Sequence, residues 1–154
     1  MKILVSSCLL GENVRYDSKN SIYSIEDLQL FNKIILENKV FSICPEISGG
    51  LLTPREPAEI IKNQVLTKTN ENVTKEFIKG SIDSLNLCKK ENIKVALLKA
   101  KSPSCGNNKI YDGTFSGILV DGMGITAKLL IENNIKVFNE KQLKDLYDFI
   151  KNYS

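Results

Sequence analysis

Short apolar segments alternate with longer segments of helical periodicity along most of the chain. Four apolar runs are typical of buried strands and lie at residues 2–7, 40–44, 94–100 and 136–138. Elsewhere apolar residues recur every three or four positions, which predicts helices at residues 25–36, 74–91, 124–133 and 141–153. The alternation predicts an α/β fold, a single-domain Rossmann-like three-layer sandwich with a mainly parallel sheet of about four to five strands.

Two segments fall outside this alternation. Residues 49–70 begin with two glycines and contain two prolines, which predicts irregular structure. Residues 110–122 predict a short hairpin or a loop excursion. No repeat, low-complexity tract or linker interrupts the chain, so we expect one domain over residues 1–154.

Charge and hydropathy narrow the class of protein. The net charge is only +3 and no block of basic residues is present, which argues against a dedicated nucleic-acid binder. The first apolar run is too short for a signal peptide, and no run approaches the ~20 residues that cross a bilayer. We therefore expect a cytoplasmic protein. In that compartment thiols stay reduced, so cysteines in loops indicate metal binding or catalysis rather than disulfides.

The sequence contains no histidine. This excludes a Ser-His-Asp triad, a Cys-His dyad and every histidine-ligated metal site. Proton transfer must use Asp, Glu, Lys, Tyr, a thiol or water. A site for a soft metal must be built from cysteine.

Three of the four cysteines follow predicted strands: Cys8, Cys44 and Cys105. Because ligands of parallel α/β sheets bind beyond the carboxyl ends of the strands, we expect these thiols to converge there. Cys105 lies in Ser-Pro-Ser-Cys-Gly, a polar turn of the kind that displays a side chain. Cys88 lies in the middle of a predicted helix among apolar positions, so we expect it in the core.

Three convergent thiols are compatible with several sites. A closed structural zinc needs four ligands, whereas a catalytic zinc uses three. A redox dithiol is disfavoured because no C-x-x-C pair is present. A [4Fe-4S] cluster held by three cysteines leaves one iron without a protein ligand, and such an iron is a Lewis acid open to substrate. On these residues alone, an incidental arrangement, a zinc and a cluster all stay open.

A rival interpretation comes from residues 117–127. A predicted strand there runs into G-x-G-x-x-A at Gly122, Gly124 and Ala127, and Glu140 ends the next strand. That spacing is typical of dinucleotide binding. A dinucleotide fold starts with this motif, however, and needs further βαβ units after it, whereas only one predicted helix follows Glu140. A tight turn that opens a helix near the site is the better interpretation.

Four blocks in fixed order resemble one bacterial family, the thiouracil desulfidases, long catalogued as a domain of unknown function. The blocks are CLLGENVRYD (8–17), CPEISGGLLTPREPAEI (44–60), LLKAKSPSCG (97–106) and GMGITAKLL (122–130). The order CLLG, CPE, TPR, SPSCG is specific, and the resemblance spans nearly the whole chain. It implies one iron–sulfur domain over residues 1–154, in which Cys8, Cys44 and Cys105 hold a [4Fe-4S] cluster with one iron not ligated by protein.

The resemblance also implies a reaction. Substrate sulfur binds the open iron, and hydrolysis replaces C=S by C=O with release of sulfide and no net redox change. The implied catalytic residues are Glu46 and Ser102. In a chain without histidine a carboxylate is the natural base. On residues alone, Glu46 is equally compatible with a solvated loop and Ser102 with a turn cap.

The expected substrate is a thiolated pyrimidine such as thiouracil or thiouridine. Some relatives carry a second domain and act on thiolated RNA; this chain lacks one, which favours a free base or nucleoside and a monomer or homodimer. Arg15 and Arg55 either contact substrate or tie loops, and Lys99 and Lys101 either polarise a substrate carbonyl or lie on the surface. Ser18 stands where the family pattern has Gly, and Asn72 where it has Asp. The alternative function is a non-catalytic iron–sulfur or metal-binding sensor.

Overall fold

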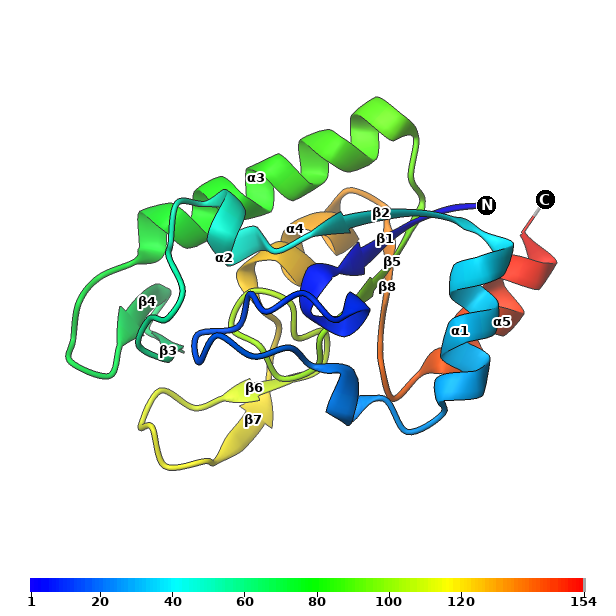
Figure 1. The fold of residues 1–154 in the computed structure, drawn as a ribbon. Coiled ribbons are helices and arrows are strands. Elements are labelled where there is room, and N and C mark those ends of the chain that lie inside the picture. The colour runs from blue at the N-terminus through cyan, green and yellow to red at the C-terminus, as the bar shows by residue number, and fades with distance from the viewer. Residues whose placement is uncertain (154) are drawn as a thin grey trace.

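A central sheet of four parallel strands organises the computed structural model, which describes residues 1–153 (Figure 1). The strands run in the order β2-β1-β5-β8, and every neighbouring pair is parallel. Their bounds are β1 (Lys2–Ser6), β2 (Lys39–Ile43), β5 (Val95–Leu98) and β8 (Lys136–Asn139). The predicted α/β fold with a mainly parallel sheet is confirmed.

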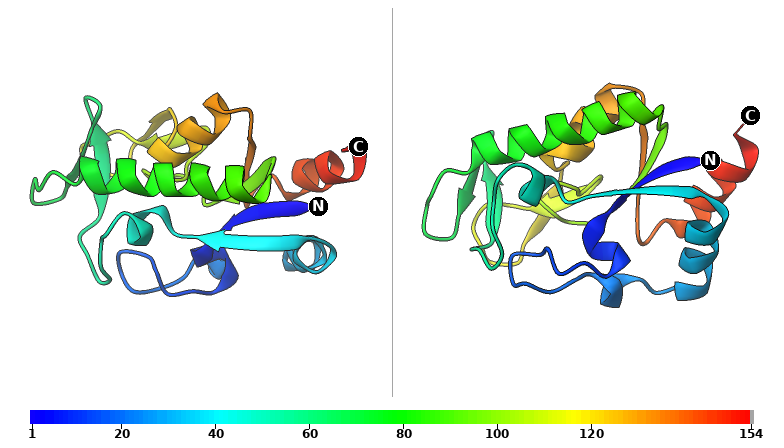
Figure 2. Two further views of the ribbon diagram at one scale, coloured as in Figure 1. Left: turned by 90° about the horizontal axis from the view of Figure 1, so that it is seen from above. Right: turned by 45° about the horizontal axis from the view of Figure 1, so that its top comes forward.

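Helices cover both faces of this sheet. One face packs against α1 (Leu28–Glu37) and α5 (Leu143–Asn152), and the other against α3 (Thr74–Glu91) and α4 (Ile125–Glu132), as two further views show (Figure 2). Successive strand side chains point to opposite faces. Accordingly Ile3 and Val5 join the core under α1 and α5, while Leu4 joins the core under α3 and α4.

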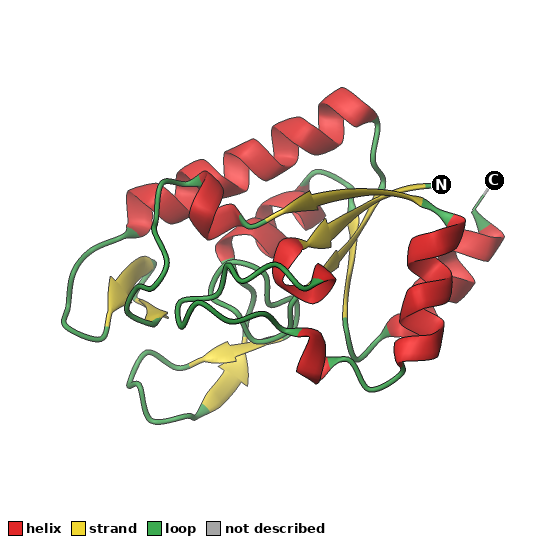
Figure 3. Cartoon of the chain, in the orientation of Figure 1, coloured by secondary structure: helices red, strands yellow, loops and turns green. Residues whose placement is uncertain are grey.

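The strand order defines where a ligand can bind. From β1 the chain moves to one side to make β2, and then returns past β1 to make β5 and β8. The direction of strand order therefore changes between β1 and β5, and ligands bind at such a switch point. Most of the long loops gather beyond the carboxyl ends of these strands (Figure 3).

Two antiparallel hairpins flank the sheet. The hairpin of β6 (Lys109–Tyr111) and β7 (Leu119–Asp121) fits the predicted excursion. The hairpin of β3 (Ala58–Ile61) and β4 (Gln64–Thr67) lies within residues 49–70, so the prediction of irregular structure was wrong for that part. Lys62 and Asn63 form its two-residue turn with φ angles of 49° and 66°. Two positive φ angles suit the right-handed twist of a tight hairpin.

Three short helical segments complete the fold: η1 (Ser7–Leu10), η2 (Ile22–Ser24) and α2 (Pro45–Ser48). Pro45 is the first residue of α2, where its missing N–H costs nothing. No helix in the described part of the chain is long and apolar enough to cross a membrane.

Candidate functional site

A cavity of about 660 Å³ lies at the carboxyl ends of the strands. We call it the strand-end pocket, and its lining includes Cys8, Cys44, Cys105, Glu46 and Ser102. The structure thus brings together all five residues that sequence analysis selected. Its volume lies within the range of about 300–1,000 Å³ that is usual for small-molecule sites.

Cys44 and Glu46 reach the pocket because α2 rests directly on the backbone of α3. A Cβ atom on Gly80 would lie 1.8 Å from the carbonyl oxygen of Pro45, and one on Gly49 would lie 1.9 Å from that of Glu76. Only glycine permits this approach. The two glycines therefore fix α2, and with it the thiol and the carboxylate, against a long rigid helix.

Cys105 is held by a turn that α4 clamps. Ser102 Oγ accepts hydrogen bonds from the N–H groups of Ser104 and Cys105, each at 3.1 Å, so Ser102 does cap this turn. The start of α4 donates back, with the N–H of Gly124 at 2.7 Å from the carbonyl oxygen of Gly106. A Cβ on Gly124 would lie 2.5 Å from the carbonyl carbon of Ser104. The glycine motif of residues 122–127 thus forms the tight turn that seats α4 on the cysteine loop.

The thiols of the strand-end pocket are shielded and influence one another. Burial raises the pKa of Cys8 and of Cys44. Burial also raises the pKa of Cys105 to about 12, with a further upward contribution from Cys8 and Cys44. Two hydroxyl groups oppose this shift: Ser6 Oγ donates to Cys105 Sγ at 3.6 Å, and Ser104 Oγ lies 3.5 Å from the same sulfur.

The donor set suits a cluster. All four cysteines are free thiols, and Cys88, a residue of α3, packs in the core and does not line the strand-end pocket. Within residues 1–153, no three cysteine, aspartate or glutamate side chains are grouped so that they could hold a single metal ion. An iron–sulfur cluster binds its thiolates on separate irons. Three cysteine thiols that line one pocket are a donor set that an iron–sulfur cluster uses.

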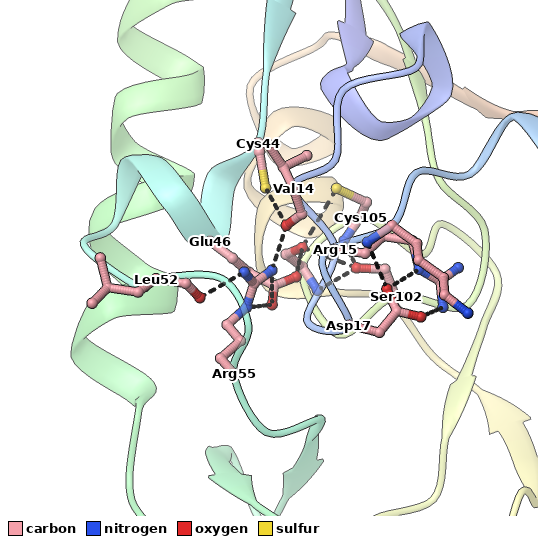
Figure 4. Close-up of polar contacts among 11 residues, drawn as sticks. Val14, Arg15, Asp17, Cys44, Glu46, Leu52, Arg55, Ser102 and Cys105 are labelled. Carbon is pink, nitrogen blue, oxygen red and sulfur yellow. Dashed lines mark hydrogen bonds and ion pairs between the residues drawn. The ribbon is translucent and has the colours of Figure 1, made fainter.

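Glu46 is anchored at both of its carboxylate oxygens (Figure 4). Arg55 Nη2 lies 3.2 Å from Oε1, and Ser104 Oγ donates to Oε2 at 3.1 Å. Arg55 also donates to the carbonyl oxygens of Val14 and Leu52. Arg55 therefore ties two loops together and supplies the counter-charge of Glu46.

The other cationic candidates differ in their surroundings. Arg15 pairs with Asp17 at 3.3 Å and contacts the hydroxyl of Tyr23, so its partners lie within its own loop. Lys99 Nζ lies 2.9 Å from Oε2 of the buried Glu140. Burial, the largest single influence, opposes the ionisation of Glu140, but Lys99 and backbone N–H groups including that of Ala100 together outweigh it, and the pKa of Glu140 is lowered. Lys101 is exposed.

Sequence reasoning missed Ser104, and it considered Glu140 only as part of a dinucleotide motif. Ser104 is 1% exposed and touches Glu46, Ser102 and Cys105. The only local signal was its place in Ser-Pro-Ser-Cys, which equally indicates a turn.

A parallel α/β sheet with three cysteine thiols, a carboxylate and two serines at its carboxyl end defines a candidate iron–sulfur enzyme. The family model described as 2-thiouracil desulfurase matches residues 3–142, so the chain belongs to that family, which acts on a carbon–sulfur bond. The family predicted from the sequence blocks is confirmed.

Two individual proteins are similar to this chain over nearly its whole length. The uncharacterized protein YbbK of Bacillus subtilis (strain 168) is 38% identical over an alignment of 154 residues. The match covers 94% of this chain and 99% of that protein. The solved structure of a [4Fe-4S]-dependent thiouracil desulfidase, TudS, is 41% identical and superposes with a TM-score of 0.88 over 97% of each chain.

Proposed function

We propose that this protein hydrolyses the C=S bond of a thiolated pyrimidine, such as thiouracil or thiouridine, to C=O and releases sulfide. The observation that carries the proposal is the meeting of Cys8, Cys44, Cys105, Glu46 and Ser102 in the strand-end pocket. Membership of the 2-thiouracil desulfurase family and likeness to a [4Fe-4S]-dependent thiouracil desulfidase support it.

The three pocket cysteines are the proposed ligands of a [4Fe-4S] cluster in which one iron has no protein ligand. When bound, such a cluster supplies a Lewis-acid iron that can accept the sulfur of the substrate. Cys88 is excluded from the ligand set because its side chain packs among the apolar residues under α3.

Glu46 is the proposed general base, and Ser102 the proposed proton donor or water-positioning group. Glu46 takes a proton from the attacking water, and Ser102 orients that water or passes a proton to the departing sulfur. The water oxygen ends in the new C=O group, and both water protons leave with sulfur as hydrogen sulfide. The balance needs no oxidant, reductant or nicotinamide.

The proposed substrate is a free base or nucleoside. A cavity of about 660 Å³ has room for either, and Tyr16, Tyr23 and Phe115 in its lining offer aromatic faces for a planar ring. We further propose a cytoplasmic protein that acts as one iron–sulfur domain over residues 1–154, as a monomer or homodimer.

The test is turnover by anaerobically reconstituted protein of measured iron and sulfide content. With 2-thiouracil or 4-thiouridine as substrate, we expect the oxo product and sulfide in equal amounts without added reductant. A cluster-loaded protein that releases no sulfide from either compound would favour the sensor. Activity that strictly requires a reductant would contradict hydrolysis, and full activity with zinc alone would remove the cluster from the reaction.

A further inference from the structure

Ser104 stands between the two proposed catalytic residues. Its Oγ lies 2.9 Å from Ser102 Oγ and 3.1 Å from Glu46 Oε2. The residue is 1% exposed, so bulk water does not compete for these contacts. Ser104 thereby connects the turn after β5 with helix α2, which is 58 positions away in the chain.

The direction of each hydrogen bond follows from counting protons. A serine hydroxyl has one proton and two lone pairs. Both lone pairs of Ser102 are used, because its Oγ accepts from the N–H groups of Ser104 and Cys105. Ser102 must therefore donate its own proton, and Ser104 Oγ is the acceptor within reach at 2.9 Å.

The second link has only one possible donor. An ionised carboxylate can only accept, so Ser104 donates its proton to Glu46 Oε2. Cys105 Sγ, at 3.5 Å, is a competing acceptor for that proton, but the charged oxygen is the stronger one. The chain of donation thus runs from Ser102 through Ser104 to Glu46, and Arg55 holds the other carboxylate oxygen.

Other buried serines of this protein are satisfied differently. Ser81 and Ser84 each donate to a backbone carbonyl of their own helix, at 2.7 Å. The hydroxyl of Ser104 instead contacts only side chains, and all of them line the strand-end pocket.

We propose that Ser104 is a positioning residue that holds Glu46 for its role as the base, an inference that rests on the proposed function. Ser104 Oγ accepts a hydrogen bond from Ser102 and donates its own proton to Glu46 Oε2, so the carboxylate is fixed against the turn that carries Cys105. As water attacks, one proton moves from the water to the Glu46 carboxylate and later leaves with the departing sulfur. Ser104 itself neither gains nor loses a proton.

The first test is Ser104→Ala in the cluster-loaded enzyme with 2-thiouracil. Because general acid–base catalysis contributes about 100- to 10,000-fold and Ser104 acts through its neighbours, we expect kcat to fall about 10- to 100-fold. KM should stay within about twofold, and the iron and sulfide content should not change. Ser84→Ala removes an equally buried hydroxyl outside the pocket and should keep wild-type kinetics. A wild-type kcat for Ser104→Ala would overturn the proposal.

The second test separates positioning of Glu46 from general structural damage. In the Glu46→Gln background no carboxylate base is left to position, so Ser104→Ala should lower kcat by much less than in wild type. Independent effects that multiply would overturn the proposal.

A third measurement does not depend on turnover. In thermal unfolding of the cluster-loaded proteins, the losses in Tm for Ser104→Ala and Glu46→Ala should be non-additive, because each removes the same hydrogen bond. A wild-type protein that releases no sulfide would refute the proposed function. Additive Tm losses would refute the Ser104–Glu46 contact on which the inference depends.

Discussion

Cys88 and Cys105 are both buried thiols, yet their surroundings differ in kind. Burial raises the pKa of both, to about 11 for Cys88 and about 12 for Cys105. Cys88 packs in the middle of α3 among apolar side chains. Cys105 borders the same core cluster but follows the end of β5, accepts from Ser6 Oγ, has Ser104 Oγ at 3.5 Å and lies near two further thiols. Burial therefore does not distinguish a functional cysteine; its position at a strand end and its polar partners do.

Removal of each thiol in turn tests most directly whether Cys88 and Cys105 differ in function. Cys8→Ala, Cys44→Ala and Cys105→Ala should each lower cluster iron strongly and reduce desulfuration to background. Cys88→Ala should keep wild-type iron content and activity, because no pocket residue depends on its sulfur. Iron and sulfide analysis after anaerobic reconstitution checks all four variants. A loss of iron in Cys88→Ala would contradict its assignment to the core.

Glu46→Gln tests whether the carboxylate in the strand-end pocket acts as a general base. The amide keeps the shape of the side chain but cannot act as a base, so kcat should fall about 100- to 10,000-fold. Iron content and substrate binding should survive, since neither uses that proton. Glu71→Gln, which alters an exposed carboxylate outside the pocket, is the matched control. Near-normal turnover with an intact cluster would exclude Glu46 as the base and return attention to Lys99 and Lys101.

The sequence predicted the parts of the site that depend on local pattern. Strands β1, β2 and β5 are short apolar runs, and each is followed by a cysteine, so parallel pairing alone brings those thiols to one edge. Helix α3 has the predicted bounds of residues 74–91. The apolar period sufficed for that prediction.

The parts that sequence reasoning missed depend on contacts between distant segments. The role proposed for Ser104 depends on its contact with Glu46, which is 58 positions away in the chain, and no local sequence pattern predicts that contact. Strand β3 pairs with β4 through a turn at Lys62 and Asn63, where the usual glycine is absent. The close contact of α2 with α3 requires the absence of a side chain at both Gly49 and Gly80. From the sequence alone, Gly49 is equally compatible with an ordinary loop, and Gly80 with an ordinary weak position in a helix.

Gly80→Ala tests this close contact from the helix that also carries Cys88. The new methyl carbon would lie 1.8 Å from the carbonyl oxygen of Pro45, so α2 must move and take Cys44 and Glu46 with it. Displacement of catalytic groups by about 1 Å can cost about 100-fold in rate, and we expect a loss of up to that size. Ser81→Ala changes the next residue of α3 and should leave kcat unchanged. An unaltered kcat in Gly80→Ala would show that the geometry of the pocket does not depend on the close packing of α2 against α3.

The smallest effect concerns Cys88 and appears only at alkaline pH. Its thiol ionises near 9.0 when unfolded but near 11 when buried in the folded protein. Below pH 9.0 both states keep the proton, so the buried neutral thiol contributes its full stability. Between pH 9.0 and about 11 the unfolded thiol loses its proton first, and the free energy of unfolding falls by about 2–3 kcal/mol in total.

Cys88→Ala leaves a cavity whose destabilising effect does not vary with pH. The difference in free energy of unfolding between wild type and Cys88→Ala should therefore shrink over that interval. Urea unfolding of both proteins from pH 7 to pH 11 measures the difference. A deficit that stays constant across the interval would mean that Cys88 is not held as a neutral thiol in the core.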